Sequence, residues 1–181
     1  MPAKMEPAPP RPEYKRYAPR RAFPIYRFVP GLNPHPVSDP RGHSYEGGKH
    51  GPPPAYVAPE NWQQNEEYLL GCDLYNFAYW WEAHEAWEGL WHLTPKNNTE
   101  GLFLQGLIQI SASNLKRHMG EPEGSKKLAT LGLQKLKNVQ IAVAPRNLYM
   151  GLDVGDFHDA AERYLIQCAE TEPFPLIQLE F

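Results

Sequence analysis

The chain has 181 residues, 41% of them apolar, and a formal net charge of −3 at pH 7. This length suits one folded domain with an appendage, and the weak charge gives no general argument for binding nucleic acid or a membrane surface. No apolar run approaches the roughly 20 residues that span a bilayer. The basic N-terminus has no apolar stretch behind it, as a secretory signal would, so we expect a cytoplasmic location.

Proline divides the chain into segments. Fifteen of the 20 prolines lie within residues 1–60, and proline excludes long helices and central strands there. We expect a disordered Pro-rich tail over residues 1–20. Residues 21–60 interleave aromatic and aliphatic groups with the prolines, which predicts an extended arm packing on the core. Residues 61–181 should form the helical bundle domain.

Helical periodicity begins after Asn61. Gly71 weakens the prediction of the first helix. The ends of the later helices are predicted at prolines and glycines. The predicted helices run from Trp62 to about Asn76, Tyr79 to Leu93, Glu100 to His118 with Thr99 as cap, Pro122 to about Val143, and onward from an Asp156 cap. Short connections predict antiparallel neighbours. The fold class is therefore all-α: a compact antiparallel bundle of about five helices, with an extended Pro-rich N-terminal arm and a short extended C-terminal tail over residues 175–181.

The segment WWEAHEAWEGLW, residues 80–91, is predicted to be the structural and functional centre. On a helical projection Trp80, Trp87 and Trp91 form an aromatic face, and His84 projects with them. Nearly every other position is apolar, which is typical of a buried helix. A single polar stripe remains, made of Glu82, Glu85 and Glu88 with His92 beside it.

Two interpretations of this stripe stay open. It is either the thin solvent-facing edge of the helix or the lining of a pocket. In a pocket, carboxylates and an imidazole one turn apart can coordinate a divalent metal ion. Crowded carboxylates can also raise one another's pKa and serve in acid–base chemistry. On this second interpretation Glu82, His84 and Glu85 are the candidate catalytic residues.

The next predicted helix carries Gln105 and Gln109 one turn apart. If it packs antiparallel to the Trp-rich helix, both amides could face the glutamate stripe and hydrogen-bond it inside the bundle. We therefore predict Glu88, Gln105 and Gln109 as ligand-binding residues.

Histidines also occur in the arm, where His35, Asp39, His43 and His50 lie in a Pro/Gly-rich stretch. Turn formation explains much of this composition, because Asp-Pro and Arg-Gly pairs favour turns. A sharper hypothesis is that the arm folds over the bundle and brings His35 or His43 to Glu82 and Glu85. The candidate metal ligands are therefore His35, His43, Glu82 and Glu85.

The two most distinctive segments resemble a known family. LYNFAYWWEAHEAWEGLW and the following FLQGLIQ run are similar to the E-A-H-E-x-x-E-x-x-W and L-Q-G-L-I-Q segments of the bacterial and archaeal family catalogued as domain of unknown function 309. The resemblance covers about residues 65–143. It implies a small helical bundle, and a helix break near Ala78, where the family often has glycine. It adds weight to Glu82, His84 and Glu85 acting together, but it implies no reaction.

Two classes of function follow from these residues. The first is a small bacterial-type helical protein whose Glu/His/Gln pocket binds a metal ion or small ligand; whether it is an enzyme stays open. The alternative is a non-enzymatic interaction or dimerisation module built on the Trp-rich helix and the arm, which would make the protein a homodimer. Anion or nucleic-acid binding by the basic region 116–146 is the weakest hypothesis. Cys72 and Cys168 are too few for a disulfide framework or thiolate metal site and are expected to be reduced.

Overall fold

The computed structural model describes residues 5–47, 52–167 and 173–181. Helices make up most of its secondary structure. The only sheet in these ranges is an antiparallel hairpin with two residues in each strand. The all-α prediction is confirmed. The elements are η1 Pro59–Gln64, α1 Glu66–Asn76, α2 Trp80–Trp91, α3 Thr99–His118, α4 Pro122–Val143, β1 Leu148–Tyr149, β2 Leu152–Asp153 and α5 Val154–Leu165. No helix in the described ranges is long and apolar enough to cross a membrane.

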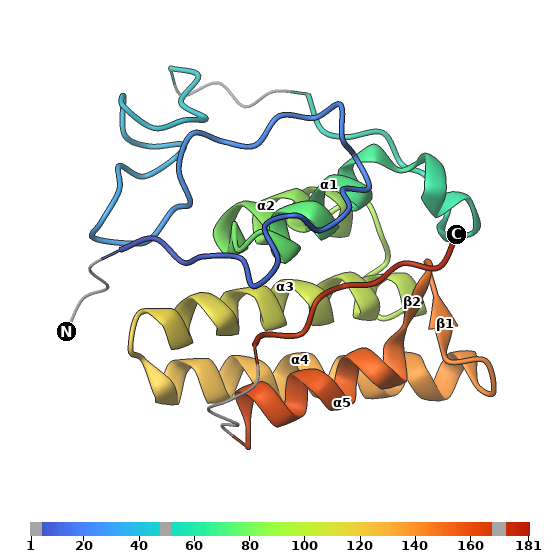
Figure 1. Ribbon diagram of the computed structural model, residues 1–181. Helices are drawn as coiled ribbons and strands as arrows, with labels where there is room; N and C mark the ends of the chain where they lie inside the picture. The colour runs from blue at the N-terminus through green and yellow to red at the C-terminus, as the bar shows by residue number, and fades with distance from the viewer. Residues whose placement is uncertain (1–4, 48–51, 168–172) are drawn as a thin grey trace.

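The helices pack in layers (Figure 1). Helices α1 and α2 form one layer, α3 lies beneath them, and α4 and α5 lie beyond α3. The start of α2 meets the end of α3, because the Ser111 hydroxyl donates to the Trp80 carbonyl and the Trp80 ring contacts His118. These two helices are therefore antiparallel, as their short connection predicts.

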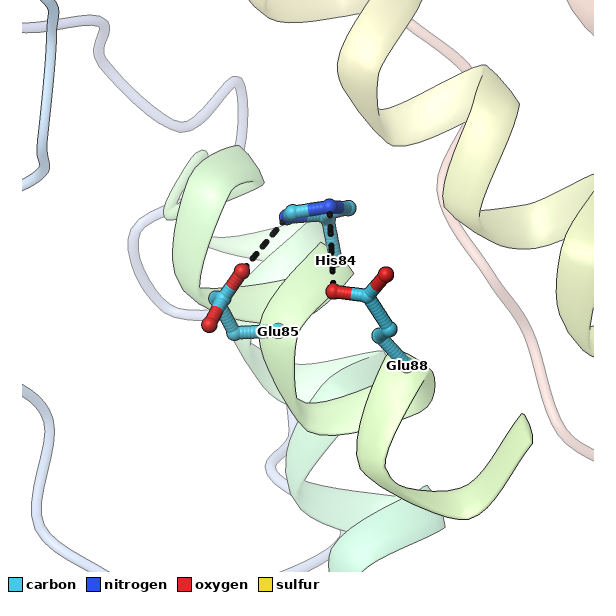
Figure 2. Close-up of side chains that lie close together, drawn as sticks. All are labelled: His84, Glu85 and Glu88. Atoms are coloured by element: carbon cyan, nitrogen blue, oxygen red, sulfur yellow. Dashed lines mark ion pairs between the residues drawn. The ribbon is translucent and has the colours of Figure 1, made fainter. Parts of the chain in front are cut away.

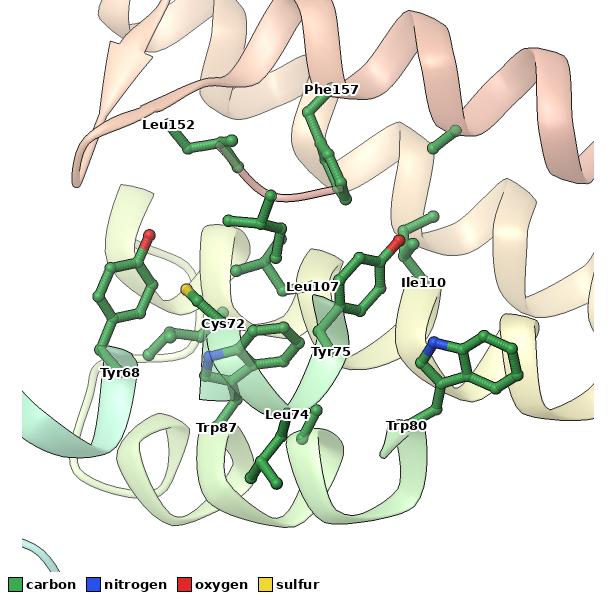
Figure 3. Close-up of a cluster of buried hydrophobic side chains, with 14 of the residues drawn as sticks. Tyr68, Cys72, Leu74, Tyr75, Trp80, Trp87, Leu107, Ile110, Leu152 and Phe157 are labelled. Atoms are coloured by element: carbon green, nitrogen blue, oxygen red, sulfur yellow. The ribbon is translucent and has the colours of Figure 1, made fainter. Parts of the chain in front are cut away.

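The core lies between the α1–α2 layer and the helices below it (Figure 3). Trp87 and Tyr75 are completely buried at its centre, with their rings 6.1 Å apart. Cys72 is a buried free thiol beside them, whereas Cys168 lies outside the described residues. The aromatic face predicted for the central helix thus builds the core through Trp80 and Trp87.

The break between α1 and α2 is sharp. Ala78 adopts a left-handed φ of 64°, and the backbone N–H of Tyr79 donates to the Leu74 carbonyl at 2.8 Å to close the turn. A left-handed residue is costly unless it is glycine. The expected break near Ala78 is confirmed.

Several helix boundaries differ from the prediction, and α2 is slightly shorter at both ends than the predicted Tyr79–Leu93. The first predicted helix is divided at Asn65 into η1 and α1. Asn98, not Thr99, caps α3 by accepting from the Gly101 N–H, and Asp153, not Asp156, caps α5. Asn98 and Thr99 are both good capping residues, and Asp153 and Asp156 are the same residue type. The path of the backbone therefore decides which residue of each pair precedes the helix.

The arm lies across α1 and α2, as the blue segments of Figure 1 show. Phe28 and Val29 are buried, and the Phe23 ring stacks on Tyr79 at 5.0 Å. Its attachment reaches back into the predicted tail, where Tyr17 and Ala18 bind the buried Asp73. The division into residues 1–20, 21–60 and 61–181 stays a prediction.

The C-terminal tail is extended and docks on the bundle, as predicted. Asn76 at the end of α1 binds both backbone groups of Ile177, accepting its N–H at 2.7 Å and donating to its carbonyl at 2.8 Å. Leu179 pairs with Leu152 of β2 in an antiparallel bridge. The tail therefore joins α1 to the hairpin.

Candidate functional site

The polar stripe of α2 divides into two environments. Glu82 is buried beneath the arm, whereas the side chains of Glu85 and Glu88 are 41% and 40% exposed. The stripe is thus neither a uniform solvent edge nor a uniform pocket lining. Each environment contains a histidine.

The exposed part is a cluster of His84, Glu85 and Glu88. Figure 2 shows the imidazole of His84 between the two carboxylates. Nδ1 of His84 lies 3.4 Å from Oε1 of Glu85, and Nε2 lies 3.7 Å from Oε2 of Glu88. One ligand atom from each residue lies within 4.8 Å of the others. Hence one histidine and two carboxylates of the same helix lie close enough together to be candidate ligands of one ion.

His84 does not join the tryptophans, which corrects the helical projection. Trp80 and Trp87 point into the core, whereas the His84 side chain is 26% exposed. At about 100° per residue, His84 lies roughly 40° from both Trp80 and Glu88, on the border between the two faces. Its ring follows the carboxylates because charged partners and water are available there.

The carboxylates crowd one another in this cluster. Burial raises the pKa of Glu85, and the charge of Glu88 adds to that effect. The charges of His84 and His35 act in the opposite direction. Two carboxylates and an imidazole at such separations favour any cation that can enter between them.

The buried part of the stripe pairs Glu82 with the arm. Nε2 of His43 lies 2.9 Å from Oε1 of Glu82, and both side chains are only 5% exposed. The backbone N–H of Phe28 donates to the same carboxylate oxygen at 2.9 Å. Burial raises the pKa of Glu82, while the bonds from His43 and Phe28 oppose the rise. The second carboxylate oxygen is buried with no hydrogen-bond partner.

The four metal ligands predicted from sequence do not form one cluster. His43 reaches Glu82, but Glu85 belongs with His84 and Glu88. His35 turns Nδ1 toward the backbone N–H groups of Val37 and Ser38, at 3.3 Å from each. Its ring packs edge-on against Trp81 at 5.4 Å, so it lies between the two groups without joining either. His50 is outside the described residues.

The glutamines predicted to bind a ligand make no hydrogen bond to the glutamate stripe. No hydrogen bond joins Gln105 or Gln109 to Glu82, Glu85 or Glu88, all of which the structure describes. Gln109 packs against α4, where its Cβ lies 3.2 Å from the position that a Cβ would take on Gly132. Its side-chain oxygen is buried without a partner. The two helices are antiparallel, but the rotation of α3 turns this side chain away from α2.

Comparison with known proteins concerns the same central region. Residues 68–128 match the model of the family described as Domain of unknown function (DUF309). This is the family that the two sequence segments resemble. The DUF309 segment contains all of α2 and α3 and most of α1, and so it includes His84, Glu85 and Glu88. The arm, with His35 and His43, precedes it. No curated protein matches the chain.

Two further residues at or near the site were not predicted from the sequence. Ser44 places its hydroxyl oxygen 2.8 Å from Nδ1 of His43, and Asp73 is completely buried beneath the arm. A serine in an irregular stretch has no spacing to mark it. Asp73 does carry one weak signal, because it is a charged residue within an otherwise apolar helix.

Proposed function

We propose that this protein binds a divalent metal ion through His84, Glu85 and Glu88 on α2. The single observation that carries the proposal is the convergence of three ligand atoms within 4.8 Å. One imidazole and two carboxylates suit first-row divalent ions such as Zn²⁺, Mn²⁺, Fe²⁺ and Co²⁺. Similar sets from helical bundles hold such ions in other proteins.

The orientation of His84 supports this assignment. Nδ1 lies 3.2 Å from the carbonyl oxygen of Trp81. A carbonyl oxygen only accepts hydrogen bonds, so Nδ1 carries the proton and the lone pair is on Nε2, the nitrogen beside Glu88. Histidines that bind metals are commonly held in this way through the other ring nitrogen. The backbone of α2 therefore presets the tautomer that a metal site needs.

The exposure of the cluster indicates what kind of site it would be. Glu85 and Glu88 are accessible enough to rotate, and an ion could enter from solvent without unfolding the bundle. Three protein ligands leave further coordination positions open, a property of catalytic rather than structural sites. When loaded, such a site supplies Lewis-acid chemistry to a bound anion or water.

Calorimetric titration of the metal-free protein with Co²⁺ and Zn²⁺ tests the proposal. We expect one ion per chain, and His84→Ala or Glu88→Gln should weaken binding by about 10-fold or more. His92→Ala is the matched control, because His92 follows the last residue of the same helix, is 63% exposed and lies 3.9 Å from Glu88. Equal binding by all four proteins, or no binding by the wild type, overturns the proposal.

The interaction module has less support. It rests on the Trp-rich helix and the extended arm, and in this chain the arm residues Phe23 and Phe28 pack against the protein's own Phe77 and Trp81. The homodimer stays a prediction that light scattering on the purified protein can test.

A further inference from the structure

A second site lies where the arm covers α1 and α2. A cavity of about 260 Å³ opens there between two passes of the arm and the helices below. The arm contributes Arg21, His43 and Ser44 to its wall, and α2 contributes Glu82. Leu70, Leu74 and Trp81 provide an apolar floor. The pocket therefore combines a few convergent polar groups with an apolar surface, as ligand sites commonly do.

Three of these polar groups are connected in series. The Ser44 hydroxyl oxygen lies 2.8 Å from Nδ1 of His43, and Nε2 of the same ring lies 2.9 Å from Oε1 of Glu82. If Glu82 is the ionised acceptor, Nε2 carries the proton and the lone pair on Nδ1 faces the serine hydroxyl. This is the arrangement of nucleophile, base and orienting carboxylate that activates a serine.

The surroundings hold the base in place. The backbone N–H of His43 donates to the Tyr26 hydroxyl at 3.1 Å, and the Tyr26 ring packs on the imidazole at 4.5 Å. The backbone N–H of Ser44 donates to the Pro36 carbonyl at 3.0 Å. His43 is nearly completely shielded from water, whereas Ser44 is exposed. The base is thus rigid and dry, and the nucleophile is accessible.

We propose that Ser44, His43 and Glu82 form a catalytic triad that hydrolyses esters of small apolar acids. The serine oxygen would attack the ester carbonyl carbon while its proton passes to Nδ1 of His43. The tetrahedral intermediate then expels the alcohol, which takes that proton, and leaves an acyl ester on Ser44. Water, activated by the same histidine, cleaves this ester, releases the acid and restores the serine hydroxyl.

The pocket also contains a positive charge for the oxyanion. Arg21 lines it, and one of its terminal nitrogens pairs with Oε1 of Glu67 at 2.6 Å, the one side-chain pairing of this guanidinium among the described residues. A guanidinium has five N–H donors, so further donors are available to a developing oxyanion. The apolar floor of Leu70, Leu74 and Trp81 would receive the acyl chain.

This activity is separate from the proposed metal site. Ser44, His43 and Glu82 are not part of the His84, Glu85 and Glu88 cluster, although Glu85 also lines the pocket. Activity measured in excess EDTA therefore reports on the triad alone. Either proposal can fail while the other holds.

The experiment uses the full chain in EDTA with p-nitrophenyl butyrate as substrate and a fluorophosphonate as covalent probe. We expect hydrolysis above background and a single phosphonylated residue, Ser44, in the peptide mass spectrum. Ser44→Ala should lose labelling and at least about 100-fold in kcat/KM. Ser38→Ala is the matched control, because Ser38 is an exposed serine in the same stretch and should stay within about 2-fold of wild type.

Glu82→Gln supplies a second variant that preserves the shape of the orienting residue. It should keep the fold, measured by circular dichroism, and lower kcat by at least about 10-fold. Absence of labelling at Ser44 in the wild type overturns the proposal. So does hydrolysis that Ser44→Ala leaves unchanged, or that appears only when metal is restored.

Discussion

The carboxylate of Asp73, in the middle of α1, accepts a hydrogen bond at 2.7 Å from the backbone N–H of Tyr17. Its other oxygen accepts the N–H of Ala18 at 2.9 Å and faces the Arg16 guanidinium at 3.3 Å. Three consecutive residues that precede the arm therefore converge on one buried side chain and attach the N-terminal segment to α1. Because the arm that follows covers the Ser44 pocket, this attachment bears on the site as well as on stability.

Replacement of Asp73 by alanine should detach this N-terminal segment. The two backbone N–H groups would lose their acceptor in a buried environment, and we expect a loss of about 3 kcal/mol in the free energy of unfolding. Urea unfolding measures the loss, and limited proteolysis should show faster cleavage before residue 30. Asp39→Ala is the control, because that carboxylate pairs with Arg41 in an exposed turn and should leave both readouts unchanged. Equal effects of the two substitutions would contradict the anchoring role.

Stability should also depend on pH through Asp73. Burial raises the pKa of this carboxyl above its ordinary value of 3.8, and the bonds from Tyr17, Ala18 and Arg16 only partly offset the rise. A folded-state pKa above the unfolded value gives a contribution that is fully present below the unfolded pKa. It is lost as pH rises through the folded pKa. The wild type should therefore lose stability relative to Asp73→Asn as pH increases from acid toward neutral. A wild type that instead gains stability relative to Asp73→Asn as pH rises would mean that the hydrogen bonds outweigh burial.

Much of the fold follows from local sequence patterns. Proline placement separates the arm from the bundle, and apolar periodicity locates α4 with both ends correct at Pro122 and Val143. The caps are harder, because Asn98 and Thr99 are both good capping residues and only the path of the preceding chain selects one. The short hairpin of β1 and β2 has too few residues to produce an alternating pattern.

The candidate site was predictable only in part. Spacing along α2 correctly placed Glu85 and Glu88 on one stripe, but it could not reveal that Glu82 on the same stripe is buried. That burial comes from His43 and Phe28, which lie 39 and 54 residues earlier in the chain. A helical projection contains no information about what covers the helix. For the same reason, it could not choose between the two faces that His84 borders.

Gly71 shows how a single glycine can be misread from sequence, where it only weakens the helix prediction. In the structure it allows α1 to approach the indole of Trp87, and a Cβ there would lie 2.6 Å from Cδ1 and 2.7 Å from Cε2 of that ring. Alanine improves helix propensity by about 1 kcal/mol, but the overlap with a fully buried tryptophan should outweigh it. We expect Gly71→Ala to lower the free energy of unfolding by about 2 kcal/mol, measured by urea denaturation.

Gly89 in α2 supplies the matched control for this prediction. A Cβ at that position would lie 3.6 Å from Pro54, an ordinary contact. Gly89→Ala should therefore stabilise the protein by about 0.5–1 kcal/mol through helix propensity alone. If both alanines stabilise, the close approach of Trp87 to α1 does not constrain position 71.

Metal binding at His84, Glu85 and Glu88 should be visible as added stability. An ion that binds the folded chain at one site, at a free concentration 100-fold above its Kd, raises the free energy of unfolding by about 2.7 kcal/mol. The unfolded chain has no such convergence of ligands, because these residues meet only when α2 is formed. Thermal unfolding with and without Zn²⁺ should therefore show a rise in Tm that excess EDTA reverses. Glu88→Gln should reduce the rise by about half or more, whereas Glu82→Gln should retain it, since Glu82 lies outside the cluster. A rise of equal size in both variants would place the ion elsewhere on the protein.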